Sequence, residues 1–527
     1  MKDGSAARRI VLFLFAGSAC VSGCTQTNAV REDSDVPTNS ESDLETMETD
    51  TTTDTENGPE GDSEKGTEIE IDTEIDTEPD LSVSILENEI FLEEQVVTKT
   101  VQTVLEVSWR QKSAADSVWL RFTFENDEWY ESPKKTGDPG RHREVVLGVP
   151  EETNVTIHVM SLTGGGESVE YETVGTTGSV PDSVPQATLL DYDPSLASAD
   201  RWMLGSVENT PTETSFYVGP FCILIIDRKG RVVWYYLDLA WNPCMAFPRI
   251  APNGTHIAID RSERGGTNRR SVVRTTLDLA QFEELVTPRM ADGMALTDDG
   301  GILFASTDWL RELRPDGTIR EIWHCPTWVE ETDASSVSLD GFLGCYPNTV
   351  NWNSLNDSIL LSYPTANTVV EVSRQTGEVI AQYGKVDGSW DFDPSNSELE
   401  CVHGANITEA GTLLVSVREP GTGFPATPVP HYFIEFELDP TEQIATEIWR
   451  YGEGIDDFPK WKGEAYRMPG GNTLVNYGTG GIIREVTPDG RTAWHVKYDA
   501  DFENDYTNKM VGHTILIDDL YALTEGW

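Results

Sequence analysis

The side chains best suited to chemistry stand at one recurring place, upstream of a turn that leads into an apolar strand. The glycines that open this turn are Gly254, Gly300, Gly411 and Gly471. Eight residues upstream of them lie Ala246, Asp292, His403 and Gly463. A related turn at 356–358 has Tyr346 and Asn348 in the comparable place. Because equivalent positions of a repeat come together in a repeat protein, these slots form the candidate site.

Each of these four polar side chains has a chemical role open to it and a plainer alternative. The imidazole of His403 can act as a nucleophile in group transfer, or it is a hydrogen-bonded histidine on the rim with no reactive role. Asn348 is a hydrogen-bond donor. The high pKa of a phenol makes Tyr346 a packing residue or hydroxyl donor rather than a base. Asp292 is either a turn residue or half of a cation site.

The elements that position these side chains repeat six times. The repeated phrase is an alternating apolar strand, a tight turn and a second strand that usually ends on an aromatic residue, at 222–236, 271–286, 308–323, 367–383, 431–449 and 481–496. A further strand precedes most copies, and a fourth is expected on an inner rim. Repeats 37–64 residues apart that contain only antiparallel strands predict an all-β, six-bladed β-propeller over 181–527.

A smaller β domain is predicted ahead of the propeller, over 83–180. Short alternating strands at 104–109, 117–124 and 155–160, with turn residues between them, are typical of a β-sandwich. With Trp109 as an early core tryptophan, this stretch resembles a fibronectin type III module. Its expected role is spacing and support.

The first 23 residues have the pattern of an export signal. Lys2, Arg8 and Arg9 precede an apolar run that is too short to span a bilayer. The run ends at Val21-Ser22-Gly23-Cys24, which resembles the lipobox of bacterial lipoproteins, so lipidation is expected at Cys24. An ordinary cleaved signal that happens to contain cysteines is the alternative. Thr25 replaces the aspartate that resembling signals use for inner-membrane retention, which favours the outer membrane.

A long acidic stretch, 24–82, follows the lipidation site. Its residues 32–80 hold 20 Asp or Glu and one Lys, and such a segment cannot bury a core. We expect a disordered, extended tether; a cation-binding tail is the less favoured alternative. The formal net charge of the whole chain is −52. Residues 32–80 contribute −19 and residues 1–31 contribute +3, so a charge of −36 remains for the two folded domains. A body of this charge excludes nucleic acid as a partner.

The cysteine pattern predicts no cofactor. Of the seven cysteines, Cys20 is removed with the signal and Cys24 is lipidated. Five remain, an odd number, at Cys222, Cys244, Cys325, Cys345 and Cys401. Short loops favour disulfides within 222–244 and 325–345, while a bond between 345 and 401 competes with the second of these. The alternative is that several are small buried residues. Their spacing fits neither a zinc site nor a CxxC redox pair.

The propeller resembles the arylsulfotransferase family. The resemblance rests on His403 followed by Gly411-Thr412-Leu413-Leu414, on Asn348-Thr349-Val350 leading into 356–362, and on the run from Arg467 to Leu474. That family is a six-bladed propeller with a small amino-terminal β-domain, and it moves a sulfuryl group between phenols through a sulfated histidine. The resemblance implies that His403 is this histidine and that Asn348 is the asparagine of the family's His-x-Asn element.

Several family positions differ in this chain. Tyr346 stands where the His-x-Asn histidine is expected, Pro364 where an arginine is expected, and Asp292 or Ala246 where another axial histidine is expected. Sulfuryl transfer gathers negative charge on the leaving phenolate, which needs His and Arg donors, whereas Asp292 adds repulsion. Three arginines lie near the slots and are candidates to compensate: Arg249, Arg289 and Arg418.

Two functions are therefore predicted. The first is a lipid-anchored aryl-sulfate sulfotransferase whose partner is a phenolic or sulfate-ester small molecule, with His403 as nucleophile and Asn348 as donor. The second is a catalytically inactive surface propeller that binds a ligand or a protein. In both, the lipid on Cys24 is the only contact with the membrane. The substrate and the oligomeric state do not follow from the sequence.

Overall fold

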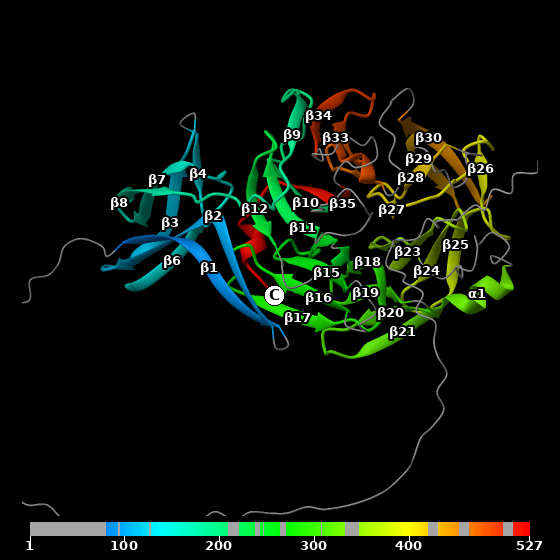
Figure 1. Cartoon of the computed structure of the whole chain (residues 1–527), viewed down its shortest axis with the longest axis horizontal. Helices are drawn as coiled ribbons and strands as arrows, with labels where there is room; N and C mark the ends of the chain where they lie inside the picture. The colour runs from blue at the N-terminus through cyan, green and yellow to red at the C-terminus, as the bar shows by residue number, and fades with distance from the viewer. Residues whose placement is uncertain are drawn as a thin grey trace, which may run out of the picture.

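The computed structural model describes residues 81–527 except 93–94, 126–127, 209–220, 238–242, 246, 264–269, 307, 333–346, 420–429, 453–462 and 499–509. The regular structure of this part is almost entirely β-strand, which confirms the all-β prediction (Figure 1). Its helical elements are α1 (Cys325–Glu331) and the short 3-10 turns η2 (Gly478–Gly480) and η3 (Ala522–Thr524). None of the described helices is long and apolar enough to cross a membrane. The predicted signal, Cys24 and nearly all of the acidic tether lie outside the described residues.

The amino-terminal strands form two sheets. The first has the order β1-β2-β6, with β1 (Ser82–Leu92), β2 (Gln95–Gln111) and β6 (Gly140–Val146). The second has the order β4-β3-β7-β8, with β5 paired to β3; its strands are β3 (Ala115–Thr123), β4 (Trp129–Glu131), β5 (Lys135–Gly137), β7 (Asn154–Thr163) and β8 (Gly166–Thr176). Apolar side chains of both sheets share one core around Trp109, so the two sheets are packed face to face. The likeness to fibronectin type III modules stays a prediction.

Six further sheets follow in the described part of the chain (Figure 1). Sheet 1 comprises β10 (Trp202–Glu208), β11 (Phe221–Asp227), β12 (Val232–Tyr236) and β35 (Val511–Ile517). Sheet 2 comprises β13 (Pro243–Met245), β14 (Pro248–Ile250), β15 (Ile257–Glu263), β16 (Arg270–Thr275) and β17 (Phe282–Val286). Sheet 3 comprises β18 (Met290–Leu296), β19 (Ile302–Ser306), β20 (Trp309–Leu313) and β21 (Ile319–His324).

Sheets 4 to 6 repeat this plan. Sheet 4 comprises β22 (Thr349–Asn353), β23 (Ser358–Tyr363), β24 (Thr368–Ser373) and β25 (Val379–Gly384). Sheet 5 comprises β26 (Asp391–Asp393), β27 (Ala405–Ile407), β28 (Leu413–Arg418), β29 (His431–Asp439) and β30 (Ile444–Tyr451). Sheet 6 comprises β31 (Glu464–Arg467), β32 (Thr473–Asn476), β33 (Ile482–Val486), β34 (Thr492–Lys497) and β9 (Thr188–Tyr192).

One strand of each sheet lies on a common inner ring. Around this ring β14 contacts β18, β18 contacts β22, and the contacts continue through β27, β31 and β35 back to β14. A closed ring of inner strands, each leading outward into its own antiparallel sheet, is the plan of a β-propeller. The ring places one strand of every sheet beside the central axis, and this is what positions a site.

Some turns between strands require glycine, because φ is positive there and another part of the backbone lies too close for a Cβ atom. At Gly377, between β24 and β25, φ is +74°, and a Cβ would lie 2.1 Å from the carbonyl oxygen of Ile322 in sheet 3. Only glycine fits there. The aromatic residues that end the second strand of the repeats are buried at Trp234, Trp323, Tyr383 and Trp494, whereas Trp449 is half-buried.

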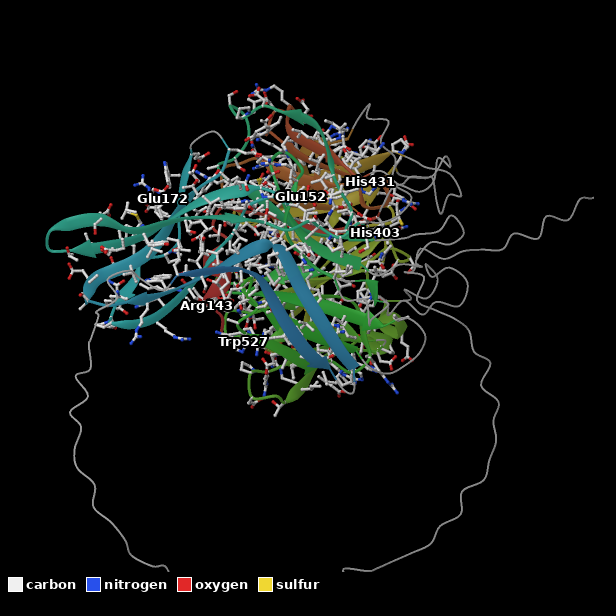
Figure 2. All side chains as sticks on the ribbon, turned by 60° about the vertical axis from the view of Figure 1, so that its left-hand side comes forward. Arg143, Glu152, Glu172, His403, His431 and Trp527 are labelled. Atoms are coloured by element: carbon white, nitrogen blue, oxygen red, sulfur yellow. The ribbon has the colours of Figure 1, made fainter. Side chains whose placement is uncertain are left out.

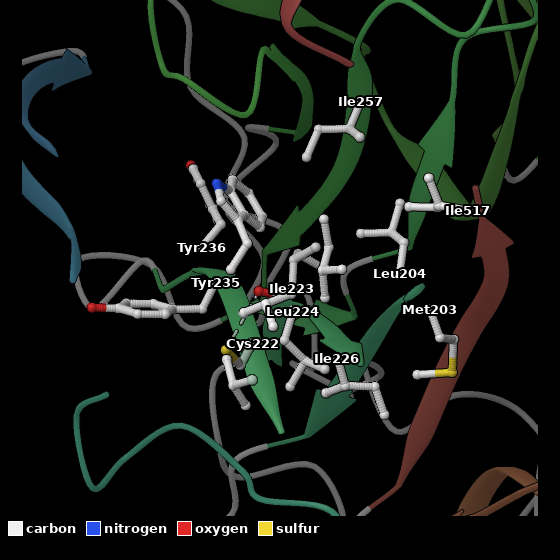
Figure 3. Close-up of a cluster of buried hydrophobic side chains, with 14 of the residues drawn as sticks. Met203, Leu204, Cys222, Ile223, Leu224, Ile226, Tyr235, Tyr236, Ile257 and Ile517 are labelled. Carbon is white, nitrogen blue, oxygen red and sulfur yellow. Dashed lines mark hydrogen bonds between the residues drawn. The ribbon is translucent and has the colours of Figure 1, made fainter. Parts of the chain in front are cut away.

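The two ends of the chain close the ring. The last strand, β35, is the inner strand of sheet 1 and pairs with β10, while β9 pairs with β34 at the outer edge of sheet 6. Figure 3 shows the buried cluster that this closure forms around Cys222, Leu224 and Leu204, with Ile517 of β35 beside it. Removing β35 would therefore open the inner ring.

The sandwich and the propeller share buried contacts. The Thr103 hydroxyl donates to the Val233 carbonyl at 2.8 Å, and the Tyr521 hydroxyl donates to the Val145 carbonyl at 2.8 Å. At the edge of this contact Arg143, labelled in Figure 2, donates to Asp278 at 3.2 Å. The sandwich therefore supports the propeller directly through a packed interface.

Candidate functional site: the His403 corner and the axial cavity

His403 lies immediately ahead of β27 and is 4% exposed. Its backbone is held by neighbouring strands: its N–H donates to Ser416 at 3.0 Å, and its carbonyl accepts from the Ser362 hydroxyl at 2.7 Å. Its ring meets Asn348, whose Nδ2 lies 2.8 Å from His403 Nδ1 across the boundary between sheets 4 and 5. The structure therefore brings together two of the four predicted site residues.

With the amide of Asn348 oriented as in the structure, the contact fits one tautomer of His403. An amide nitrogen can only donate, so Nδ1 of His403 accepts, and in the neutral ring the proton lies on Nε2. That nitrogen is 3.9 Å from the Cys401 sulfur, which is buried. In this arrangement neither nitrogen of the ring presents a lone pair to a substrate.

The other two predicted site residues are less fully described. Tyr346 lies outside the described residues. Asp292 is placed by its backbone in β18, and nothing follows about its side chain. The next residue, Gly293, lies against sheet 4, because a Cβ on it would stand 3.2 Å from the Val350 nitrogen and 3.7 Å from the Asn348 carbonyl oxygen. The backbone at Asp292 is thus near Asn348, and the roles of all four residues stay predictions.

A second histidine fills the neighbouring slot. A Cβ at Gly463 would lie 2.6 Å from His431 Nε2, so the ring of His431 occupies the space that a side chain at 463 would need. Figure 2 labels both His431 and His403. Burial lowers the pKa of His431 well below its usual value, and the charges of Arg418 and His403 lower it further. Arg418 is itself buried at the end of β28.

The inner strands enclose an axial cavity of about 250 Å³. All six inner strands contribute to its wall. The polar lining residues are Arg249, Asn351, Asn406, Glu464, His513 and Thr514. The apolar ones include Ile250, Leu296, Trp352, Ile407, Leu474 and Ile515. Neither His403 nor Asn348 is among the residues that line this cavity, although Gly404 is.

Two asparagines bind the wall of the cavity together. Asn351 Nδ2 donates to the Ala405 carbonyl at 2.7 Å, and Asn406 Nδ2 donates to the Ala465 carbonyl at 2.8 Å. Each bond therefore runs from one sheet to the next. With their amide nitrogens held in this way, the asparagines are fixed parts of the cavity wall.

Arg249 holds the equivalent place in sheet 2 and carries a charge into the cavity. Its Nε donates to the Met294 carbonyl at 3.1 Å, and its Nη2 lies 3.4 Å from Asn351 Oδ1. The side chain is 9% exposed, and its Nη1 is buried without a hydrogen-bond partner among the described residues. Burial lowers its pKa, while the negative charges of Glu464 and Asp260 act to raise it.

Glu464 and His513 form the other polar pair of the cavity. His513 Nδ1 lies 2.6 Å from Glu464 Oε2. The pKa of His513 is lowered by burial and by the charge of Arg249, and the Glu464 carboxylate acts against this shift. The Nδ1–H of His513 can donate to the Glu464 carboxylate.

Three of the residues that line this cavity also occupy equivalent positions in the repeats, three residues after the positions predicted to form the site. Arg249, Asn351 and Asn406 lie five residues upstream of the turns at Gly254, Asn356 and Gly411, whereas the predicted site residues Asn348 and His403 lie eight residues upstream. His513 also lines the cavity, from the inner strand β35. Of the arginines proposed to compensate, Arg249 enters the cavity and Arg289 is exposed. Nothing in the sequence predicted Glu464.

The cysteines differ from the short-loop expectation. Cys222 and Cys401 carry buried thiols, so the proposed 222–244 and 345–401 bonds are wrong. The small Cys222 side chain is packed inside the core of sheet 1. Cys325 is disulfide-bonded, and Cys345 lies outside the described residues. Among the described residues, no group of three or more His, Cys, Asp or Glu side chains is placed to hold a metal ion.

Comparisons with known proteins give likenesses of structure. No protein-family model matches the chain, and no curated protein matches it. A streptogramin B lyase is 15% identical over 63% of this chain and 98% of its own, with a TM-score of 0.36. A virginiamycin B lyase from Staphylococcus aureus is 14% identical over 67% and 93%, with a TM-score of 0.33.

An auxiliary nutrient binding protein from Bacteroides thetaiotaomicron is 11% identical over 77% of this chain and 83% of its own, with a TM-score of 0.31. Likenesses this weak carry no argument about function. The arylsulfotransferase resemblance therefore stays a prediction, and the propeller-type fold of this chain rests on its sheets and their closed inner ring.

Proposed function

We propose that this protein is a ligand-binding propeller, displayed from a membrane by a lipid on Cys24 and the acidic tether, whose axial cavity takes a small molecule. The observation that carries the proposal is the cavity itself. It has about 250 Å³ of space, six strands contribute to it, and its wall combines apolar side chains with a few fixed polar ones. That combination is typical of small-molecule sites.

Binding is favoured over transfer by the state of His403. A histidine nucleophile needs a ring nitrogen with a lone pair directed at the substrate. In His403 one nitrogen accepts from Asn348, and the other carries the proton and faces Cys401. The family positions that would stabilise developing charge are also replaced, by Tyr346 and Pro364.

Filling the cavity tests the proposal. Ala295, in β18, lines the cavity and is 5% exposed. In the variant Ala295→Phe, the added ring occupies the space that a ligand needs, so binding of small aromatic probes should weaken by about tenfold or more. Ligand-observed NMR with phenol, benzamide, benzylamine and benzoate measures this. Ala295→Ser is the matched control, because it keeps the cavity open. If no probe binds, or if binding is equal in all three proteins, the cavity is not the ligand site.

Sulfuryl transfer is the second candidate, because His403 and Asn348 are the two positions that match the family's pattern and they lie side by side. In that reaction a ring nitrogen bonds to sulfur as the S–O bond to the phenolate breaks, and the sulfuryl group then passes to an acceptor phenol. With 4-nitrophenyl sulfate and phenol, we expect equal background release of 4-nitrophenol from wild type and from His403→Gln. The control is His142→Gln in the sandwich. Release that is lost only in His403→Gln would replace the binding proposal with the enzyme.

A further inference from the structure

We propose that the ligand of the axial cavity is a small organic monoanion with an apolar body, such as an aryl or alkyl carboxylate, and that its charged head binds the guanidinium of Arg249 at Nη1. This inference rests on the proposed function, since it names the class of molecule that the same cavity takes.

The guanidinium of Arg249 is the observation that points to an anion. Two of its nitrogens have partners, the Met294 carbonyl and the side-chain oxygen of Asn351, and both partners are neutral. The third nitrogen, Nη1, is buried and has no hydrogen-bond partner in the described part of the chain. A guanidinium keeps its charge at any pH a protein meets, and a buried charge with incomplete pairing is costly. An oxyanion supplies both the missing acceptor and the missing charge.

The charges around Arg249 favour one negative charge on the ligand over two. Glu464 and Asp260 act on Arg249 through their negative charges, yet neither makes an ion pair with it within 4 Å among the described contacts. Glu464 is held by His513 instead, and Asp260 accepts from the Gly293 N–H at 3.3 Å. A dianion would be repelled by these carboxylates more strongly than a monoanion. Inorganic sulfate and phosphate are thus disfavoured.

The apolar body of the ligand is inferred from the residues that directly follow the Arg249 layer on four of the inner strands. Ile250, Leu296, Trp352 and Ile407 each follow a residue of the layer that contains Arg249, and all four line the cavity. An aromatic or branched aliphatic group in contact with them is removed from water, whereas a bare inorganic anion leaves this surface uncovered. The cavity therefore has a charged layer and an apolar layer, which match the two ends of an amphiphilic monoanion.

Calorimetric titration of the full-length protein tests this inference. The probes are benzoate and phenyl sulfate as monoanions, benzamide as the neutral analogue, benzylamine as the cation, and inorganic sulfate. We expect benzoate or phenyl sulfate to bind and the other three probes to bind at least about tenfold more weakly. Arg249→Met should weaken the monoanion by about 10- to 100-fold, and Arg249→Lys by less. Arg289→Met, at an exposed arginine, is the matched control and should bind as wild type does.

The outcomes separate the inference from the proposed function. If benzamide or benzylamine binds as tightly as benzoate, or if Arg249→Met binds benzoate normally, the monoanion is wrong while a cavity blocked by Ala295→Phe still supports a ligand site. Sulfate binding as tight as benzoate overturns the preference for one charge. Far-ultraviolet circular dichroism shows whether Arg249→Met is folded. If it is not, the comparison of benzoate with benzamide on the wild type decides, because it needs no variant.

Discussion

Deleting residues 510–527 is expected to abolish the folded propeller. This segment contains β35, the inner strand of sheet 1, and places Val511, Ile517, Leu520 and Leu523 in the core with exposures of 0–5%. Burial of one such side chain contributes about 1.5–3 kcal/mol, so four of them approach the whole stability of a typical domain, about 5–15 kcal/mol. The deletion also leaves β10 with an unpaired inner edge.

Thermal melting followed by circular dichroism measures this effect. The matched control removes only 525–527, which keeps β35 and the buried Leu523. We expect a cooperative transition in the control and none attributable to the propeller in the longer deletion. A cooperative melt of the longer deletion within a few degrees of wild type would show that closure by β35 does not hold the ring together.

Glu485→Ala is expected to lower the free energy of unfolding by about 3–5 kcal/mol, the usual cost of breaking a buried ion pair. Glu485 is fully buried in β33, where it accepts from Arg228 Nη1 at 2.7 Å, from Asn472 Nδ2 at 2.6 Å and from the Ser198 N–H at 2.6 Å. Arg228 belongs to sheet 1 and also stands over the Trp494 ring of sheet 6, at 5.2 Å. The pair therefore joins the first sheet to the last, and removing the carboxylate leaves a buried guanidinium without its counter-charge.

Urea unfolding gives the size of this effect. Glu167→Ala is the control, because its pair with Lys134 is largely exposed and such pairs contribute about 0–1 kcal/mol. The double variant Arg228→Met with Glu485→Leu should recover most of the loss, since apolar residues of similar size replace buried pairs well. A loss under about 1 kcal/mol in Glu485→Ala would mean that this pair is not needed for closure.

The all-β architecture could be predicted because short sequence patterns indicate its strands and turns. Alternating strands recur in every repeat and a glycine turn in most of them, as at Gly377, and both patterns can be read from neighbouring residues in the sequence. The inner strand β35 shows what such patterns miss. It follows the last repeat and joins the first sheet, and no local pattern indicates a pairing between positions more than 300 residues apart. The contacts between Thr103 and Val233, which dock the sandwich, are hidden for the same reason.

The site was predictable only in part. Counting eight residues back from each turn brought Asn348 and His403 together, because equivalent positions of adjacent repeats face each other around the ring. The cavity lies at a different layer, five residues back. The position along the inner strands at which a cavity is left depends on side chains that bond from one sheet to the next. An example is Asn351, which donates to the Ala405 carbonyl, 54 residues away. Glu464 and His513 meet in the same way across 49 residues, so neither could be assigned from its own repeat.

The measurement that tests the central claim most directly is a crystal structure of the protein soaked with 4-bromobenzoate, with data collected at the bromine absorption edge. We expect an anomalous peak inside the axial cavity, with the carboxylate on Arg249 Nη1 and the bromine among the apolar residues around Trp352. A peak beside His403, or at any position outside the cavity while the cavity stays unoccupied, would contradict the account.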